Sequence, residues 1–198
     1  MNDIPNLHRP PALDAIERDA AAVGFSMAAE ARTGALLQTL AASKPGGAML
    51  ELGTGVGVST SWILAGMDES ATLLTVDNNQ PCIEIARRHL GHDRRVAFKL
   101  EDGAAFLAQM QGRKFDLIFA DTWPGKFDHL DQALGLLRAG GIYLVDDLLP
   151  QPNWPPGHAP KVPLLIDQIE HEPCLVLCKF AWSSGLLVAV RRPGDTHL

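Results

Sequence analysis

Short apolar runs alternate with helical patterns through most of the chain, and this alternation limits the fold more than any other feature. The runs are AMLEL (48–52), TLLTV (72–76), VAFKL (96–100), FDLIFA (115–120) and GIYLV (141–145). Near-continuous apolarity is typical of strands that are covered on both faces. The sequence therefore predicts an α/β fold with a Rossmann-like, doubly wound, mostly parallel sheet and helices on both faces.

The C-terminal part departs from this rhythm. The strand-like runs PCLVLCKFAW (173–182) and GLLVAVRR (185–192) are separated only by the short link Ser183–Ser184. Because this link is too short for a helical crossover, the two runs must pair as an antiparallel hairpin. With the five earlier runs, the hairpin predicts a seven-stranded sheet.

A length of 198 residues suits a single domain. Residues 1–12 are rich in proline and predict a loose N-terminal arm. Helical patterns follow at about 13–24 and 27–42, and a Rossmann-like core is expected over 43–192. Within that core, apolar residues at steps of three and four predict a helix that Gly140 and Gly141 stop. These apolar residues are Phe127, Leu130, Leu134 and Leu137.

Charge and hydropathy disfavour two classes of partner. The formal net charge is -6 and no cluster of Lys and Arg stands out, whereas nucleic-acid binding needs such a cluster to replace counterions. No apolar run approaches the roughly 20 residues of a membrane span, and the N-terminus has no signal-peptide layout. We therefore expect neither nucleic acid nor membrane as a partner, and a cytoplasmic location.

The segment MLELGTGVGVSTSWIL (49–64) joins the first apolar run to a helical pattern through three alternate glycines. A dinucleotide site favours Gly-x-Gly-x-x-Gly, whose third glycine allows close packing of helix on strand. Here Gly53 and Gly55 fit, but Val58 stands where the third glycine belongs. The mismatch disfavours an NAD site without excluding it, and purely conformational glycines stay an alternative.

Three acidic residues stand at the ends of the first three predicted strands. Glu51 lies where a structural residue would be apolar, and its carboxylate could meet a cationic amino group. Asp77 comes about 20 residues after the glycine turn, where an acid accepts hydrogen bonds from ribose hydroxyls. Asp102 is placed to receive an adenine amino group. Because Asp77 and Asp102 both precede helices, simple N-caps are the alternative.

Five blocks of sequence carry a family resemblance: ELGTGVGVSTSWIL, VDNN, EDGAAF, FDLIFADTWPGKF and LRAGGIYLVDDLL. In their order and spacing they resemble the class I S-adenosylmethionine-dependent methyltransferases, most of all the small catechol and caffeoyl-CoA type O-methyltransferases. The resemblance spans about residues 27–192. It implies S-adenosylmethionine as the cofactor, with residues around its methionine part, ribose and adenine. These are Glu51, Gly53, Thr54, Gly55, Ser59, Asp77, Asn78, Asp102, Gly103, Ala104 and Asp121.

The next two strands also end in acids. Asp121 follows the fourth strand, and Asp146 and Asp147 follow the fifth. If these strands are neighbours, about 4.8 Å apart, the three carboxylates converge at the carboxyl edge, where they could hold Mg²⁺ or another divalent cation. The resembled family binds a metal there with two Asp and one Asn. The alternative is that Asp121 and Asp146 are cofactor contacts or caps.

The catalytic base is less clear. The resembled family has a lysine three residues after its first metal-site Asp, and that position is Pro124 in this chain. Lys126 either reaches in from the start of the following helix or is an ordinary solvated lysine. The segment PQPNWPPGHAPKV (150–162) predicts a stiff loop over the same edge. From it, His158 is a candidate general base or a surface histidine, and Trp154, with Trp123, could stack on a planar acceptor.

The sequence thus predicts an S-adenosylmethionine-dependent methyltransferase that methylates an oxygen of a small aromatic or hydroxylated molecule. Two alternatives stay open: a binding module that retains the cofactor without catalysis, and an NAD-dependent oxidoreductase. The identity of the acceptor and the formation of a homodimer are not determined by the sequence, because the loops that select substrates are irregular here.

Overall fold

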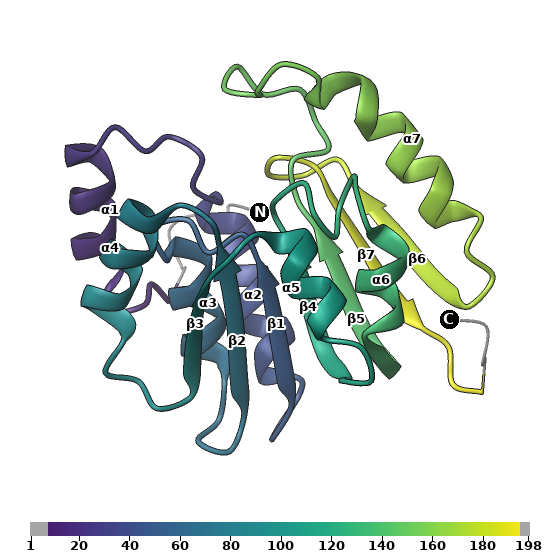
Figure 1. The fold of residues 1–198 in the computed structure, drawn as a ribbon, viewed down its shortest axis with the longest axis horizontal. Helices are drawn as coiled ribbons and strands as arrows, with labels where there is room; N and C mark the ends of the chain where they lie inside the picture. The colour runs from purple at the N-terminus through teal and green to yellow at the C-terminus, as the bar shows by residue number, and fades with distance from the viewer. Residues whose placement is uncertain (1–7, 195–198) are drawn as a thin grey trace.

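Seven strands form one sheet in the computed structural model, which describes residues 8–194 (Figure 1). The sheet order is β3-β2-β1-β4-β5-β7-β6. The strands are β1 (Ala48–Leu52), β2 (Thr72–Asp77), β3 (Val96–Leu100), β4 (Phe115–Ala120), β5 (Leu137–Val145), β6 (Leu175–Phe180) and β7 (Leu186–Arg191). The helices are α1 (Leu13–Ala22), α2 (Ala31–Ala42), α3 (Val58–Gly66), α4 (Gln80–Leu90), α5 (Gly103–Gln109), α6 (Leu130–Gly135) and α7 (His158–Glu170).

Strands β1 to β5 run parallel to one another, and β7 lies antiparallel between β5 and β6. The predicted seven-stranded, doubly wound sheet with a terminal hairpin is therefore confirmed. A strand pair closed by so few residues can only be antiparallel, which is why the short link after Trp182 was informative.

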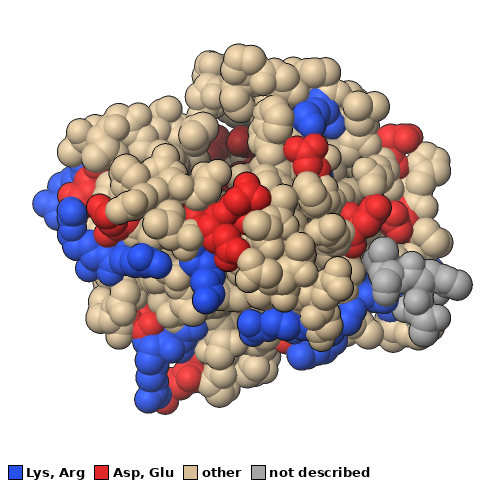
Figure 2. Space-filling view, viewed as in Figure 1, with Lys and Arg blue, Asp and Glu red and all other residues tan. Residues whose placement is uncertain are grey.

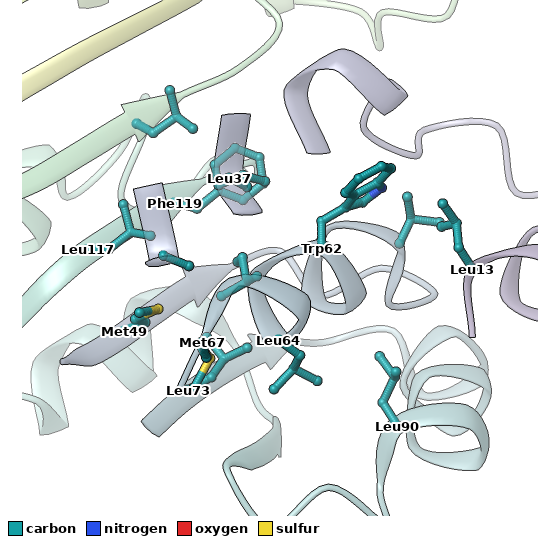
Figure 3. Packing of buried hydrophobic residues seen from close by; sticks show 14 of the residues in the cluster. Leu13, Leu37, Met49, Trp62, Leu64, Met67, Leu73, Leu90, Leu117 and Phe119 are labelled. Atoms are coloured by element: carbon teal, nitrogen blue, oxygen red, sulfur yellow. The ribbon is translucent and has the colours of Figure 1, made fainter. Parts of the chain in front are cut away.

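Alternate residues of each buried strand face opposite layers of helices. On β1, Met49 packs with helices α1 to α4, whereas its neighbour Leu50 packs with α5 to α7. Figure 3 shows the first layer, where Trp62 of α3 lies near Leu37 of α2 and Leu13 of α1. Burial on both faces is the physical reason why the strands read as continuous apolar runs.

Three predicted boundaries were wrong. The second helix begins at Ala31 instead of residue 27, so residues 25–30 are free to cross the edge of the sheet. The helix predicted to extend from Phe127 to Leu137 is only α6, because Leu137 already pairs with Phe115 in the sheet. The segment 150–162 is a loop only up to Gly157, whose positive φ starts α7.

The N-terminal arm is described only in part. Residues 1–7 lie outside the described residues, so the arm predicted over 1–12 stays a prediction there. Next to them, Arg9 pairs with Asp14 and Glu17 at the start of α1. Between residues 8 and 194 no helix is long and apolar enough to cross a membrane.

Candidate functional site

The register of the sheet brings the functional side chains to one edge. Leu52 pairs with Ala120, and Ala120 pairs with Val145, so the residues that follow these three positions lie side by side. Those residues are Gly53, Asp121 and Asp146. The predicted neighbourhood of β4 and β5 is therefore confirmed, the structure adds β1 beside β4, and the carboxyl edge of the sheet is the site of interest.

A cavity of about 340 Å³ opens at this edge, and Figure 2 shows a recess there with acidic atoms inside it. Residues from three parts of the chain line it: the glycine turn, the end of β2 and the segment after β4. The predicted site residues among them are Gly53, Thr54, Gly55, Ser59, Asp77, Asn78, Asp121, Lys126, Asp147 and His158. The structure thus brings together most of the predicted donor and acceptor residues.

The glycine turn needs its glycines for conformation and for space. Gly53 has φ +103, and a Cβ there would lie 2.8 Å from the carbonyl oxygen of Asp121. Gly57 caps α3 in the left-handed conformation, where a Cβ would lie 3.0 Å from the Cβ of Ala86 on α4. Gly57 therefore permits the close helix contact here. This is the reason why Val58 can replace the third glycine of a dinucleotide motif.

Asp77 holds the turn from the neighbouring strand. Its Oδ2 accepts the Gly55 N–H at 2.8 Å, and its Oδ1 accepts the Asn79 N–H at 2.8 Å. The cap of α4 is Asn79, whose side chain accepts the Cys82 N–H. The alternative reading of Asp77 as that cap is therefore wrong, and its carboxylate lines the cavity where a ribose would be bound.

Asp102, by contrast, is a helix cap. Its carboxylate accepts the N–H groups of Ala104 and Ala105 at 3.0 Å, and it does not line the cavity. A Cβ on Gly103 would lie 2.8 Å from the side chain of Pro124, so the β4–α6 segment covers this turn. Asp102, Gly103 and Ala104 thus form a capped turn beneath Pro124 that does not line this cavity, and their predicted place beside the adenine stays a prediction.

Glu51 lies behind the cavity wall. Its side chain is fully buried, and its Oε2 accepts hydrogen bonds from the hydroxyls of Thr60 and Thr75, both at 2.6 Å. Its Oε1 has no partner among the described residues. Burial raises the pKa of Glu51 to about 7. Glu51 therefore ties α3 to β2, and its predicted contact with the ligand stays a prediction.

The three acids after β4 and β5 lie together, as predicted, but they do not form a metal site. Among residues 8–194, no three His, Cys, Asp or Glu side chains have a geometry that could hold a metal ion. Asp146 directs Oδ1 to the hydroxyl of Ser184 and to the N–H of Asp147. The buried ammonium of Lys126 acts on the same three acids and already supplies positive charge there, so with Lys126 in place the predicted Mg²⁺ site does not fit the residues present.

Lys126 lies close to the same acids. It is only 2% exposed, so the alternative of a solvated lysine is wrong. It belongs to a turn in which the Lys126 N–H bonds to the carbonyl of Trp123, and its ammonium lies 5.1 Å from the ring centre of Phe127. Burial lowers the pKa of Lys126, while the charges of the nearby acids oppose that shift. The pKa of Asp121 is raised, mainly by burial and then by Asp146.

His158 is buried at the first turn of α7 and is not a surface histidine. Its Nε2 donates to the carbonyl of Asp147 at 3.0 Å, and its ring stacks on Trp154 at 4.4 Å. Asp147 has φ +59, a conformation that Asp tolerates better than most residues. Burial lowers the pKa of His158. With Nε2 engaged, His158 braces the loop after β5 and only Nδ1 is left to accept a proton.

Sequence reasoning missed one wall of the site. Phe25, Met27, Ala28 and Ala29 line the cavity from the segment between α1 and α2. The available signal was Gly24, which ends α1 with φ +68 and breaks the helical pattern before these residues. Asn153, from the loop after β5, donates to the carbonyl of Ser26 at 2.8 Å, so the two segments meet over the site.

The unfolding free energy should fall with rising pH because of Glu51. A raised carboxyl pKa means that the folded state retains a proton which the unfolded chain releases, so stability is lost as pH rises from about 4.5 towards 7. At 1.36 kcal/mol per pKa unit the shift corresponds to about 3 kcal/mol. In thermal unfolding, the stability of Glu51→Gln relative to that of the unaltered chain should increase between pH 5 and pH 8. Glu84→Gln, on the exposed face of α4, is the control; an equal gain there contradicts the assignment.

Comparisons with known proteins agree with this geometry. The family described as "Methyltransferase domain" matches residues 50–148, which is half of the chain and includes the glycine turn and all three clustered acids. The "Probable O-methyltransferase Rv1220c" of Mycobacterium tuberculosis is 35% identical over 120 residues, 57% of this chain. The match covers 52% of that protein, so the chain spans about half the length of the curated relatives it matches.

Two solved structures share the fold over nearly their whole length. The O-methyltransferase TomG from Streptomyces achromogenes, in complex with S-adenosylmethionine, superposes with a TM-score of 0.82 at 20% identity, covering 95% of this chain and 92% of TomG. An O-methyltransferase from Bacillus cereus, in complex with S-adenosylhomocysteine, superposes with a TM-score of 0.82 at 22% identity. The superposition covers 95% of this chain and 94% of the Bacillus cereus chain. At these identities the likeness concerns the fold. The sequence match over residues 50–148 shows that the chain belongs to the methyltransferase-domain family.

Proposed function

We propose that this chain is an S-adenosylmethionine-dependent O-methyltransferase that acts on a small hydroxylated or aromatic molecule. The observation that carries the proposal is the cavity between the glycine turn and the acids after β4 and β5. One end of it has the features of a nucleoside site, and the other has titratable groups. Membership of the methyltransferase-domain family supports the same reading.

The donor end suits S-adenosylmethionine. The carboxylate of Asp77 keeps lone pairs free for ribose hydroxyls beside Asn78, and Ser59 in the first turn of α3 can meet the carboxylate of the methionine part. Gly53, Gly55 and Thr54 leave room for the ligand to approach the backbone. When bound, S-adenosylmethionine supplies a methyl group on a positively charged sulfur.

The acceptor end would align a hydroxyl with that methyl group. Asp121 follows β4 next to Gly53, so it lies at the junction of the two ends. Its raised pKa suits a carboxylate that takes a proton from the acceptor hydroxyl. Trp123 and His158 line the same end, and the loop after β5 covers it, so water is partly excluded.

The alternatives are less well supported. An NAD site lacks its third glycine at Val58. A binding module without catalysis was suggested by Pro124, but the buried Lys126 provides an amine at the acceptor end in place of the expected lysine. A formal net charge of -6 favours a small-molecule acceptor over nucleic acid. The predicted cytoplasmic location stays a prediction, and the formation of a homodimer stays open.

An acceptor screen tests the proposal. The unaltered chain is incubated with S-adenosylmethionine and a panel of catechols, phenols and hydroxylated aliphatic molecules, and formation of S-adenosylhomocysteine is followed by mass spectrometry. We expect turnover with at least one acceptor and a loss of about 100-fold in Asp121→Asn, which removes the proton acceptor. Binding of S-adenosylhomocysteine should survive in that variant. Turnover that is unaffected by Asp121→Asn would contradict the assigned role.

A further inference from the structure

The ammonium of Lys126 is unusual because it is buried without a direct partner. Within residues 8–194 it forms no hydrogen bond and no ion pair shorter than 4.0 Å, and it lies over the ring of Phe127. Burying an ammonium costs several kcal/mol unless opposite charge compensates. The compensating charges are those of Asp121, Asp147 and Asp146. Their attraction acts across a gap, because none of the three pairs with Lys126 directly.

Asp121 faces the same gap. Its carboxylate accepts no hydrogen bond from the described residues, although it lines the cavity together with Lys126. The other two acids are held elsewhere: Asp146 by Ser184, and the backbone of Asp147 by His158. Because both groups line the same cavity, the hydroxyl of a ligand could accept a hydrogen bond from the ammonium and donate one to Asp121. The unmatched pair therefore points to a ligand oxygen.

We infer that the Lys126 ammonium is a built-in cation that stabilises the acceptor oxygen, in the place where the predicted Mg²⁺ does not fit. The inference rests on the proposed function. In the step, the acceptor O–H proton passes to the carboxylate of Asp121, and the oxygen forms a bond to the methyl carbon. The carbon–sulfur bond breaks and its electrons stay on sulfur, which leaves S-adenosylhomocysteine. Lys126 keeps its proton throughout and offsets the negative charge on the oxygen.

Removal of the ammonium should expose the acids to an external cation. With S-adenosylhomocysteine bound, about 1 mM Mn²⁺ should leave the Tm of the unaltered chain unchanged and raise that of Lys126→Ala by about 3 °C. Lys126→Gln is measured in parallel in case the alanine variant does not fold, and Lys126→Arg should behave as the unaltered chain. Electron paramagnetic resonance of Mn²⁺ gives the bound fraction independently of activity.

Lys161 provides the matched control. It also lies near Trp123, at 4.8 Å from the ring centre, but it is a third exposed and pairs with Asp128. Lys161→Ala should gain no Mn²⁺ binding. The inference is overturned if the unaltered chain binds Mn²⁺ through Asp121, or if neither Lys126→Ala nor Lys126→Gln gains it. Failure to bind S-adenosylhomocysteine in the same samples would instead reject the proposed function.

Discussion

Asp77→Ala should weaken binding of S-adenosylhomocysteine about 100-fold, because hydrogen bonds to a charged acceptor contribute about 1.5–3 kcal/mol each. The carboxylate of Asp77 lines the cavity and also fixes the glycine turn through the Gly55 N–H. The substitution removes both contributions. Asp77→Asn, which retains one acceptor oxygen, should lose about 10-fold. Isothermal titration calorimetry gives both dissociation constants.

Asp102→Ala is the informative control for this experiment. Asp102 also follows a strand and precedes a helix, but its carboxylate caps α5 outside the cavity. Loss of the cap should lower the unfolding free energy by about 1 kcal/mol. Binding of S-adenosylhomocysteine should change by less than about threefold, because Asp102 does not line the cavity. A loss as large as that of Asp77→Ala would restore the adenine contact predicted from the sequence.

Gly53→Ala should be the most destabilising single substitution in the turn. A Cβ at φ +103 is strained, and here it would also lie 2.8 Å from the carbonyl oxygen and 3.0 Å from the carbonyl carbon of Asp121. Backbone atoms in a sheet cannot move aside as a flexible side chain can. We expect a loss of about 3 kcal/mol, which corresponds to a fall in Tm of about 9 °C. The cofactor site should be lost as well, because the turn and Asp121 separate.

Gly112→Ala separates the effect of backbone strain from the effect of the clash. Gly112 has φ +84, but no heavy atom lies within 4 Å of a Cβ built there. Its substitution therefore adds backbone strain without a clash and should cost only about 1 kcal/mol. Differential scanning calorimetry of both variants provides the comparison. If Gly53→Ala is no worse than Gly112→Ala, the close approach to Asp121 does not limit the turn.

The sheet could be predicted because its signals are local. Strands β1, β2, β4 and β5 are largely buried on both faces, so their residues are apolar in sequence, whereas β3 at the edge is more exposed. The short link between Phe180 and Leu186 allows only a hairpin. Helix ends were less predictable. Leu137 continues the apolar spacing of α6 but pairs with Phe115, a tertiary contact that no local pattern reports.

The residues of the site could largely be predicted from the sequence, but their contacts could not. Strand ends and turns identified Asp77 and Asp121 as cavity residues. Asp77 lines the cavity and Asp102 caps a helix, but both follow a strand and precede a helix, so no sequence pattern separates their roles. Nor could it show that Lys126 is buried, since that depends on the turn after Trp123. Burial and hydrogen-bond partners, rather than residue type, decide these roles.

Isothermal titration of the unaltered chain with S-adenosylhomocysteine, repeated in the presence of NAD, distinguishes a methyl-donor site from a dinucleotide site. We expect one binding site per chain, with a dissociation constant that excess NAD leaves unchanged. A site that binds NAD and not S-adenosylhomocysteine would contradict the assignment of the glycine turn and the cavity beside it to a methyl donor.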